Sequence, residues 1–167
     1  MVGIAVSNED GFAAAQQQLD ALLQTRQSLV LATRDEAGEC ELGVAPFVFD
    51  GSGFAVLLSG LAPHTRHLVR DPGLKVMLLE DEADVRQPFA RQRLSLGCVA
   101  ERLERDDACS QEAFGRMERQ FGSIIPLLQG LADFHVFILR PGAGRFVAGF
   151  GRAYRLDGLR VVEHLRS

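Results

Sequence analysis

Apolar and polar positions along the chain recur with two different periods, which separate helices from strands. In residues 9–25, leucines recur at helical spacing among Gln and Ala, which predicts an amphipathic helix. Residues 105–122 repeat this pattern, with Phe114, Met117 and Phe121 along one face. That second stripe favours packing against a core or a second copy of the chain over a cofactor-binding role.

Most other apolar positions form short runs of strand length. The runs that predict strands are 28–33, 40–49, 54–58, 74–79, 91–102, 134–139, 145–148 and 153–156. Leu94, Leu96 and Cys98 alternate with other residues and indicate one buried face, whereas the continuous run 74–79 indicates a buried strand. Pro46 implies an edge, a bulge or a broken ladder.

Short spacing between strands, with only two substantial helices, predicts a mainly β fold with added helices, namely an antiparallel β-barrel. A doubly wound parallel sheet would need a helix after nearly every strand. We expect one domain over residues 1–167, with the N-terminal helix at 9–25, the barrel at 28–157 and a C-terminal tail at 158–167.

Composition narrows the class of protein. The chain has 167 residues, 47% of them hydrophobic and 24% charged, as in ordinary globular proteins. A net charge of −4 argues against a nucleic-acid partner, and no apolar run approaches the roughly 18 residues of a membrane span. Three widely spaced cysteines and no basic, apolar leader predict a cytoplasmic protein with reduced thiols.

The segment LSGLAPHTRHLVRDP, residues 58–72, carries the strongest local signal. Pro63 is placed to begin a helix, with Thr65 and Arg66 facing outward near its N-terminus. A hydroxyl, a guanidinium and free backbone N–H groups there would bind an anion such as phosphate. The alternative is a surface helix with solvated basic residues. The apolar positions expected to face a sheet are Leu61, Leu68 and Val69.

The histidines form no complete metal site. His64 and His67 are three residues apart on the predicted helix but lack a third ligand, and His135 lies within a predicted strand. His164 belongs to a terminal stretch where fraying is expected. Asp133 could orient a nearby imidazole or cap a turn.

Two further segments offer ligand-binding chemistry. Arg91, Gln92 and Arg93 open a strand and could receive a phosphate or a polar ring edge, or form a solvated strand end. In GFGRAY, residues 149–154, two glycines flank Phe150. They would allow a flat ligand to approach the backbone and the aromatic ring, although a β-bulge would need the same glycines.

Taken in order, LAPHTRHL, FARQRLSL and FVAGFGRAY resemble the haem-utilisation (HugZ/HutZ-like) branch of the pyridoxamine 5′-phosphate oxidase-like, FMN-binding split-barrel superfamily. The resemblance extends over residues 12–157. It implies a homodimer of six-stranded antiparallel split barrels with two cofactor sites between the subunits. The positions that it implies for cofactor binding are Val44, Ala45, Pro46, Phe47, Ser59, Thr65, Arg66 and Gln92. Arg93 and Phe150, from the two segments above, complete the predicted cofactor site.

The resemblance leaves the cofactor open between haem and FMN. The strand LGVAPF lacks the basic residue that grips the flavin phosphate in FMN-binding relatives, which fits the haem branch better. In that branch an axial histidine follows a segment similar to VVEHLRS, so His164 is the candidate iron ligand and Asp133 the acidic residue that supports it.

The sequence thus predicts a haem-utilisation-type protein that binds haem at the dimer cleft and degrades it oxidatively. An FMN-dependent oxidoreductase is the main alternative, and a non-catalytic binding or storage protein is a third. No nucleic-acid or membrane partner is expected.

Overall fold

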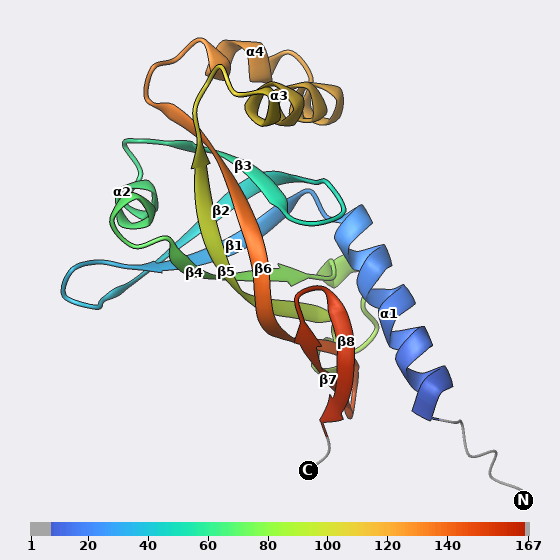
Figure 1. Ribbon diagram of the computed structural model, residues 1–167. Helices are drawn as coiled ribbons and strands as arrows, with labels where there is room; N and C mark the ends of the chain where they lie inside the picture. The colour runs from blue at the N-terminus through green and yellow to red at the C-terminus, as the bar shows by residue number, and fades with distance from the viewer. Residues whose placement is uncertain (1–7, 166–167) are drawn as a thin grey trace, which may run out of the picture.

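A computed structural model describes residues 8–165 (Figure 1). The helices are α1 (Asn8–Thr25), α2 (Pro63–Arg70), α3 (Ala108–Phe121) and α4 (Ile124–Gln129), with short 3-10 turns η1 (Glu82–Asp84) and η2 (Pro88–Ala90). The strands are β1 (Ser28–Arg34), β2 (Cys40–Phe49), β3 (Phe54–Ser59), β4 (Gly73–Leu79), β5 (Arg93–Leu103), β6 (Phe134–Gly149), β7 (Arg152–Asp157) and β8 (Arg160–Leu165).

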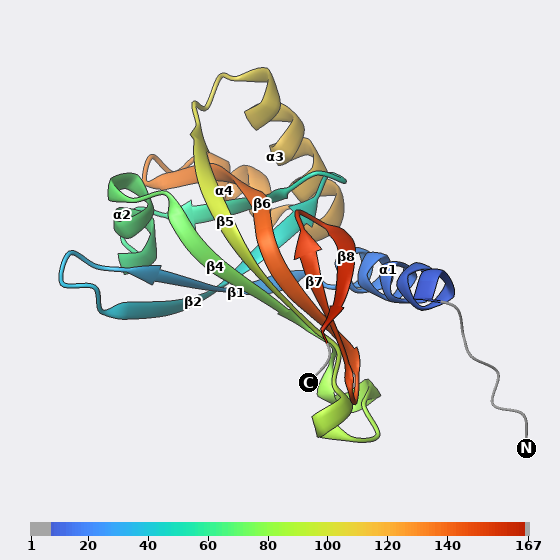
Figure 2. The same ribbon diagram turned by 60° about the horizontal axis from the view of Figure 1, so that its bottom comes forward.

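Six strands close into an antiparallel barrel, as the sequence predicted. Their order is β3-β2-β1-β4-β5-β6, and a further pairing between β3 and β6 completes the ring. Strands β7 and β8 then extend the sheet beyond the end of the barrel (Figures 1 and 2). The eight strands therefore comprise the expected barrel and an added hairpin.

Strand β2 changes its partner at Pro46. Its pairing with β1 ends at Ser28 opposite Pro46, and its pairing with β3 begins at Phe47 opposite Val56. Proline has no backbone N–H for a ladder, so it fits the position at which one ladder ends and another begins.

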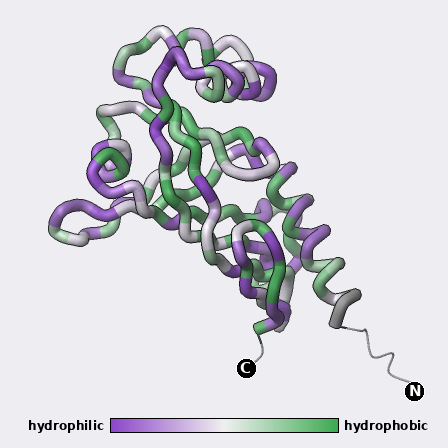
Figure 3. Tube along the Cα trace, viewed as in Figure 1, coloured by the Kyte–Doolittle hydropathy of each residue, from purple (hydrophilic) through white to green (hydrophobic). Residues whose placement is uncertain are grey.

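The interior of the barrel forms the main core, where the Phe47 and Phe54 rings meet edge to face at 5.3 Å. A second, smaller core lies between α3 and the barrel. There Phe114 and Met117 pack with Val48, as expected for the apolar stripe. The hydropathy follows this arrangement, with hydrophobic strands at the barrel centre and a mostly hydrophilic β1–β2 connection (Figure 3).

The C-terminal segment 158–167 was predicted to be a tail, and this prediction is wrong for its described part. Residues 160–165 form β8, which pairs with β7. The amide of Gln16 on α1 holds the hairpin, because its Nε2 donates to Leu159 O (3.0 Å) and its Oε1 accepts from Val161 N (2.9 Å). Helix α1 thus gives this segment a partner that a local pattern could not reveal.

The two strands expected at 134–139 and 145–148 are in fact one strand, β6. It continues through Pro141 and Gly144, and a register shift between Leu96 and Cys98 absorbs the irregularity. A Cβ at Gly144 would lie 2.6 Å from Ser95 O, so this glycine permits close approach of β5 instead of ending the strand.

Two smaller expectations also differ from the structure. Strand β4 was predicted to be buried, but it alternates, with Lys75 and Met77 exposed, because only one of its faces meets the core. Helix α3 begins at Ala108, three residues later than expected, after a turn at residues 105–107. Within residues 8–165 no helix is long and apolar enough to span a membrane.

Candidate functional site

The barrel has one sheet face that no other described element covers completely. A row of cross-strand partners crosses it from β2 to β6; the row, termed here the open face, consists of Val44, Val30, Met77, Ser95 and Arg145. Val44 is 67% and Met77 36% exposed. Apolar side chains thus dominate one end of the row and a cation ends the other.

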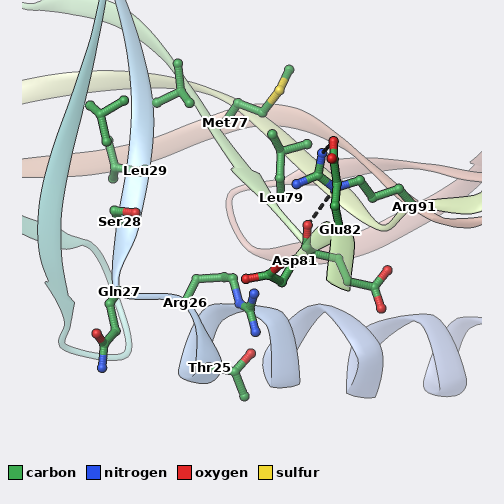
Figure 4. A pocket seen from close by; sticks show the side chains of 13 residues that line it. Thr25, Arg26, Gln27, Ser28, Leu29, Met77, Leu79, Asp81, Glu82 and Arg91 are labelled. Carbon is green, nitrogen blue, oxygen red and sulfur yellow. Dashed lines mark hydrogen bonds and ion pairs between the residues drawn. The ribbon is translucent and has the colours of Figure 1, made fainter. Parts of the chain in front are cut away.

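One cleft beside the open face carries mixed charge (Figure 4). It measures about 620 Å³ and lies between the α1–β1 connection and η1. Arg26, Asp81 and Glu82 line it, and Arg91 Nη1 forms an ion pair with Glu82 Oε1 at 2.9 Å. The charges in this cleft partly offset one another, so it is a poor site for an anionic ligand.

At the far end of the barrel, the structure brings together Ser59 and Asp133, which are 74 positions apart. Ser59 Oγ donates to Asp133 Oδ2 at 2.9 Å and accepts from Leu61 N at 3.2 Å. Gly60 N donates to Asp133 O at 2.6 Å. Asp133 therefore anchors the β3–α2 connection. With the neighbouring Thr65 and Arg66, these residues are termed the α2 site.

Helix α2 begins at Pro63 as predicted, but its orientation differs from the prediction. Thr65 is 2% exposed, and its Oγ1 has no hydrogen-bond partner among residues 11–165. Leu61 and Val69, expected to face the sheet, are 80% and 61% exposed. The helix covers an end of the barrel, so Thr65 and Leu68 face the interior. Arg66 is exposed, and its Nη1 donates to Leu61 O at 3.0 Å.

The histidines of α2 dock it to the barrel. His67 Nδ1 lies 3.0 Å from Thr33 Oγ1. His64 packs over Gly43, where a Cβ would lie 2.8 Å from Nδ1. Burial lowers the pKa of His64; Glu41 opposes this shift and His67 adds to it. Among the side chains of residues 11–165, no three His, Cys, Asp or Glu are placed to hold a metal ion.

His135 lies close to Asp133, but its protonation is unsuitable for binding iron. Arg102 Nη2 lies 3.1 Å from His135 Nδ1, so Nδ1 accepts and Nε2 carries the proton of the neutral ring. Burial, Arg102 and Arg105 lower the pKa of His135, against the opposing effect of Asp133. The contact with Arg102 links β5 and β6 on the outside of the barrel.

The cysteines do not supply a nucleophile to these sites. Cys98 is buried, and burial raises the pKa of its thiol to about 12. Cys40 and Cys109 are exposed, and all three are free thiols.

A second cleft, of about 540 Å³, lies at the end of β6 opposite to the α2 site and is lined by cations and aromatic rings. It is termed the arginine cleft, and its main lining residues are Arg93, Arg145, Arg152, Phe89 and Phe150. Phe89 and Phe150 are 79% and 81% exposed. Arg93 and Phe150 were predicted as site residues, and the fold brings them together. Gln92 lies beside them, with its backbone N donating to Glu80 Oε2 at 2.9 Å.

His164 also borders the arginine cleft, but its ring is already in contact with the protein. It lies opposite Tyr154 on the core side of the hairpin, with the ring centroids 4.9 Å apart. Its Nε2 is enclosed and has no hydrogen-bond partner within the described chain. The residue is thus fixed in β8 instead of fraying.

Within a single chain, the residues predicted to form the site do not all lie close together. Asp133 precedes β6, whereas His164 lies on β8 beyond the other end of β6 (Figure 1). Among the β2 positions, Val44 and Pro46 are exposed, but Ala45 and Phe47 are 1% exposed and point into the core. Neither of the latter two is open to a ligand in the single chain.

Sequence reasoning missed Arg145, Arg152 and Phe89. The signal for Arg152 was present, since it directly follows the Gly-Phe-Gly turn whose exposed ring was recognised. Phe89 is distant from that turn in sequence, and only the fold brings η2 to it. Arg145 lies four positions before the turn, but its face of β6 follows from the pairing with β5 and β7.

Known proteins with similar sequences and structures agree with this architecture. The pyridoxamine 5′-phosphate oxidase family model matches residues 15–148. The haem oxygenase HutZ of Vibrio cholerae is 41% identical over 140 residues, which are 84% of this chain and 80% of HutZ. The crystal structure of HutZ, described there as a haem storage protein, superimposes with a TM-score of 0.71 at 38% identity, covering 75% of this chain and 88% of HutZ.

Campylobacter jejuni ChuZ superimposes with a TM-score of 0.82 at 30% identity over 93% of this chain, which spans 63% of the ChuZ chain. The family match covers most of the barrel, and the HutZ match extends over more than two thirds of both proteins. The chain therefore belongs to the pyridoxamine 5′-phosphate oxidase family, in the branch that includes HutZ.

Proposed function

We propose that this protein binds haem in a cleft completed by a second copy of the chain, and that it serves haem utilisation. The similarity to HutZ, which is named both a haem oxygenase and a haem storage protein, supports this function. The observation that carries it is the arginine cleft, where cations and exposed aromatic rings converge.

The residues present fit haem. Haem is a flat, apolar ring that bears two carboxylates. Phe89 and Phe150 offer exposed rings to stack on it, and the arginines offer charge-assisted hydrogen bonds to its carboxylates. When bound, haem would supply a redox-active iron and the ring that an oxygenase opens.

FMN is the alternative ligand, and the α2 site would have to hold its phosphate. There, Thr65 is buried and Arg66 donates to a backbone carbonyl. The described part of β2 carries Glu41 and no basic residue. These features favour haem over FMN.

A dimer would unite the two ends of the site. The apolar part of the open face, including Val44 and Met77, is suited to an isologous contact with a second copy. Such a contact can bring the α2 site of one subunit to the arginine cleft of the other. We therefore propose a homodimer that buries more than about 2,000 Å² in total, as obligate interfaces do.

His164 remains the proposed axial ligand. Its partnerless Nε2 is the atom that would bind iron, and the ring would have to leave Tyr154 to do so. In a dimer, an acidic residue such as Asp133 of the other subunit could accept the remaining ring N–H and fix the tautomer. Replacement of His164 by alanine should then shift the Soret band and weaken haem binding; an unchanged spectrum would remove His164 from the site.

The absorption spectrum of the purified protein, and of the protein titrated with each ligand, tests the proposed function. A Soret band that grows to one haem per chain supports haem binding. The two visible bands of a bound flavin would support the FMN alternative. A protein that binds neither would contradict both and support a cofactor-free role. Bound haem that is released intact under reducing, aerobic conditions would indicate storage instead of degradation.

A further inference from the structure

Three arginines meet in the arginine cleft, and one of them, Arg145, lies outside the family motifs quoted above. In the β5–β6 ladder, Arg93 lies opposite Val147 and Ser95 lies opposite Arg145. Arg93 and Arg145 are therefore diagonal neighbours on one sheet face. In β-sheets generally, the Cα atoms of such neighbours lie about 7–8 Å apart. Arg152 enters the same cleft from the first position of β7.

The guanidinium of Arg152 is positioned by the backbone beneath it. Its Nη2 donates to Ala148 O at 2.7 Å. Gly149 has a φ of 150°, and a Cβ there would lie 2.9 Å from Nη2 and 3.4 Å from Nε of Arg152. Only glycine lets the guanidinium lie so close to the chain at this register shift. The head group is thus held in place before any ligand arrives.

The charges of this cleft have no acidic partner among the side chains that the structure describes. Within residues 11–165, no carboxylate lies within ion-pairing distance of Arg93, Arg145 or Arg152. By contrast, Arg155, which lies opposite Arg145, is paired with Glu163 at 2.7 Å. Arg93 and Arg152 are held by backbone carbonyl groups, which orient them but leave their positive charge uncompensated. Such a group of cations attracts an anionic ligand.

The spacing of the cations indicates what kind of anion they suit. A phosphate monoester concentrates its charge in one group, whereas these guanidinium groups are distributed along a cleft bordered by exposed Phe89 and Phe150. We propose that Arg145 and Arg152, together with Arg93, bind the two carboxylates of a planar porphyrin and select it over a flavin phosphate. This inference rests on the proposed haem function and assigns the residues that determine its specificity.

Metal-free protoporphyrin and its dimethyl ester separate carboxylate recognition from binding through iron or stacking. Wild-type protein should bind the diacid about ten- to a hundredfold more tightly than the ester. Arg145→Gln and Arg152→Gln should each weaken diacid binding by about ten- to a hundredfold and leave ester binding unchanged. Arg119→Gln, on exposed α3, makes the same charge change at a distance and should leave both affinities unchanged.

A fourth variant separates position from charge. Gly149→Ala keeps all three arginines but displaces the Arg152 guanidinium, so it should also weaken diacid binding. Thermal unfolding of each variant shows whether it is folded, and Arg152→Lys provides a milder change that should recover only part of the affinity.

Three results would overturn the inference. The first is equal binding of diacid and ester by the wild type, and the second is Arg145 and Arg152 variants that behave like Arg119→Gln. If haem still binds in either case, the proposed function survives and only this assignment fails. The third is a wild type that binds neither porphyrin nor haem, which would overturn both proposals.

Discussion

The α2 site and the arginine cleft use similar residue types in opposite ways. In the α2 site, Ser59 and Asp133 bond to each other, and Arg66 bonds to a backbone carbonyl close by. In the arginine cleft, the guanidinium groups have no acidic partners in the described chain, and the two Phe rings are largely exposed. Apart from the buried Thr65 hydroxyl, the first region makes its own hydrogen bonds, whereas the second offers uncompensated charge to a ligand.

This difference shows that a polar motif does not by itself indicate how ready a site is to bind. The polar groups of the α2 site stabilise a helix that closes the barrel, and a ligand must compete with those contacts. In the arginine cleft, the backbone bonds of Arg93 and Arg152 orient the guanidinium groups and leave their charge uncompensated, so an anion there meets several cations at once. We therefore expect most of the ligand affinity to come from the arginine cleft, provided that a second subunit completes it.

The largest expected effect comes from separating the two regions. Met77→Glu places a charge at the centre of the open face and should convert the proposed dimer into a monomer. If the site needs both subunits, haem affinity should fall by more than about a hundredfold. Light scattering and haem titration measure the two effects.

The matched control is Leu127→Glu on α4, which introduces the same charge at another exposed apolar position. It should retain both the dimer and haem binding. A wild-type protein that is monomeric at micromolar concentration, or a dimeric Met77→Glu that binds haem normally, would contradict the shared site.

A moderate effect is expected at the α2 site. Arg66→Ala should weaken haem binding by about three- to tenfold, less than Arg152→Gln, because Arg66 is an exposed cation whereas Arg152 shares a cleft with two further arginines. Arg66→Lys should recover part of the loss, since an ammonium cannot make the fork-shaped contact. If the loss at Arg66 equals or exceeds that at Arg152, the ranking of the two regions is wrong.

The pH dependence of stability provides a smaller test of how α2 is held. Burial lowers the pKa of His64 below its ordinary value, so the unfolded chain binds a proton more readily than the folded one. This contribution to stability is fully present above about pH 6.5 and is lost as the pH falls through the lowered pKa.

Urea unfolding at about pH 7.5 and about pH 5.5 should show a decline in the wild type that His64→Gln reduces. His135, whose pKa is also lowered, should account for part of the remainder. An identical decline in the wild type and in His64→Gln would mean that the docking of α2 is insensitive to the charge of His64.

The smallest expected effect concerns Thr65. Its buried hydroxyl has no partner among the described residues, so Thr65→Val should raise the free energy of unfolding by up to about 1 kcal/mol. Haem affinity should stay unchanged, since the hydroxyl faces the barrel interior. A clear loss of haem or FMN affinity without loss of stability would instead place Thr65 in a ligand site.

Much of the fold was predictable from local pattern. The period of the apolar residues located α1, the stripe of α3 and most strands, because each buries one face against a single core. The predictions failed where contacts with a segment distant in sequence determine whether a residue belongs to a strand. Pro141 and Gly144 predicted the end of a strand, yet pairing with β5 keeps both residues in β6. The segment predicted to be a tail forms the β7–β8 hairpin, which Gln16 of α1 holds by hydrogen bonds.

The sequence by itself determined the barrel, the helix at Pro63 and the residue types from which a haem or flavin site can be built. The tertiary structure decided which of those residues face a ligand. It turned Thr65 inward, bonded Ser59 to Asp133, and gathered Arg93, Arg145, Arg152 and Phe150 into one cleft. The physical reason is that periodicity reports which face of an element is apolar, whereas the rotation of a short helix and the register between distant strands depend on contacts made only when the whole chain packs.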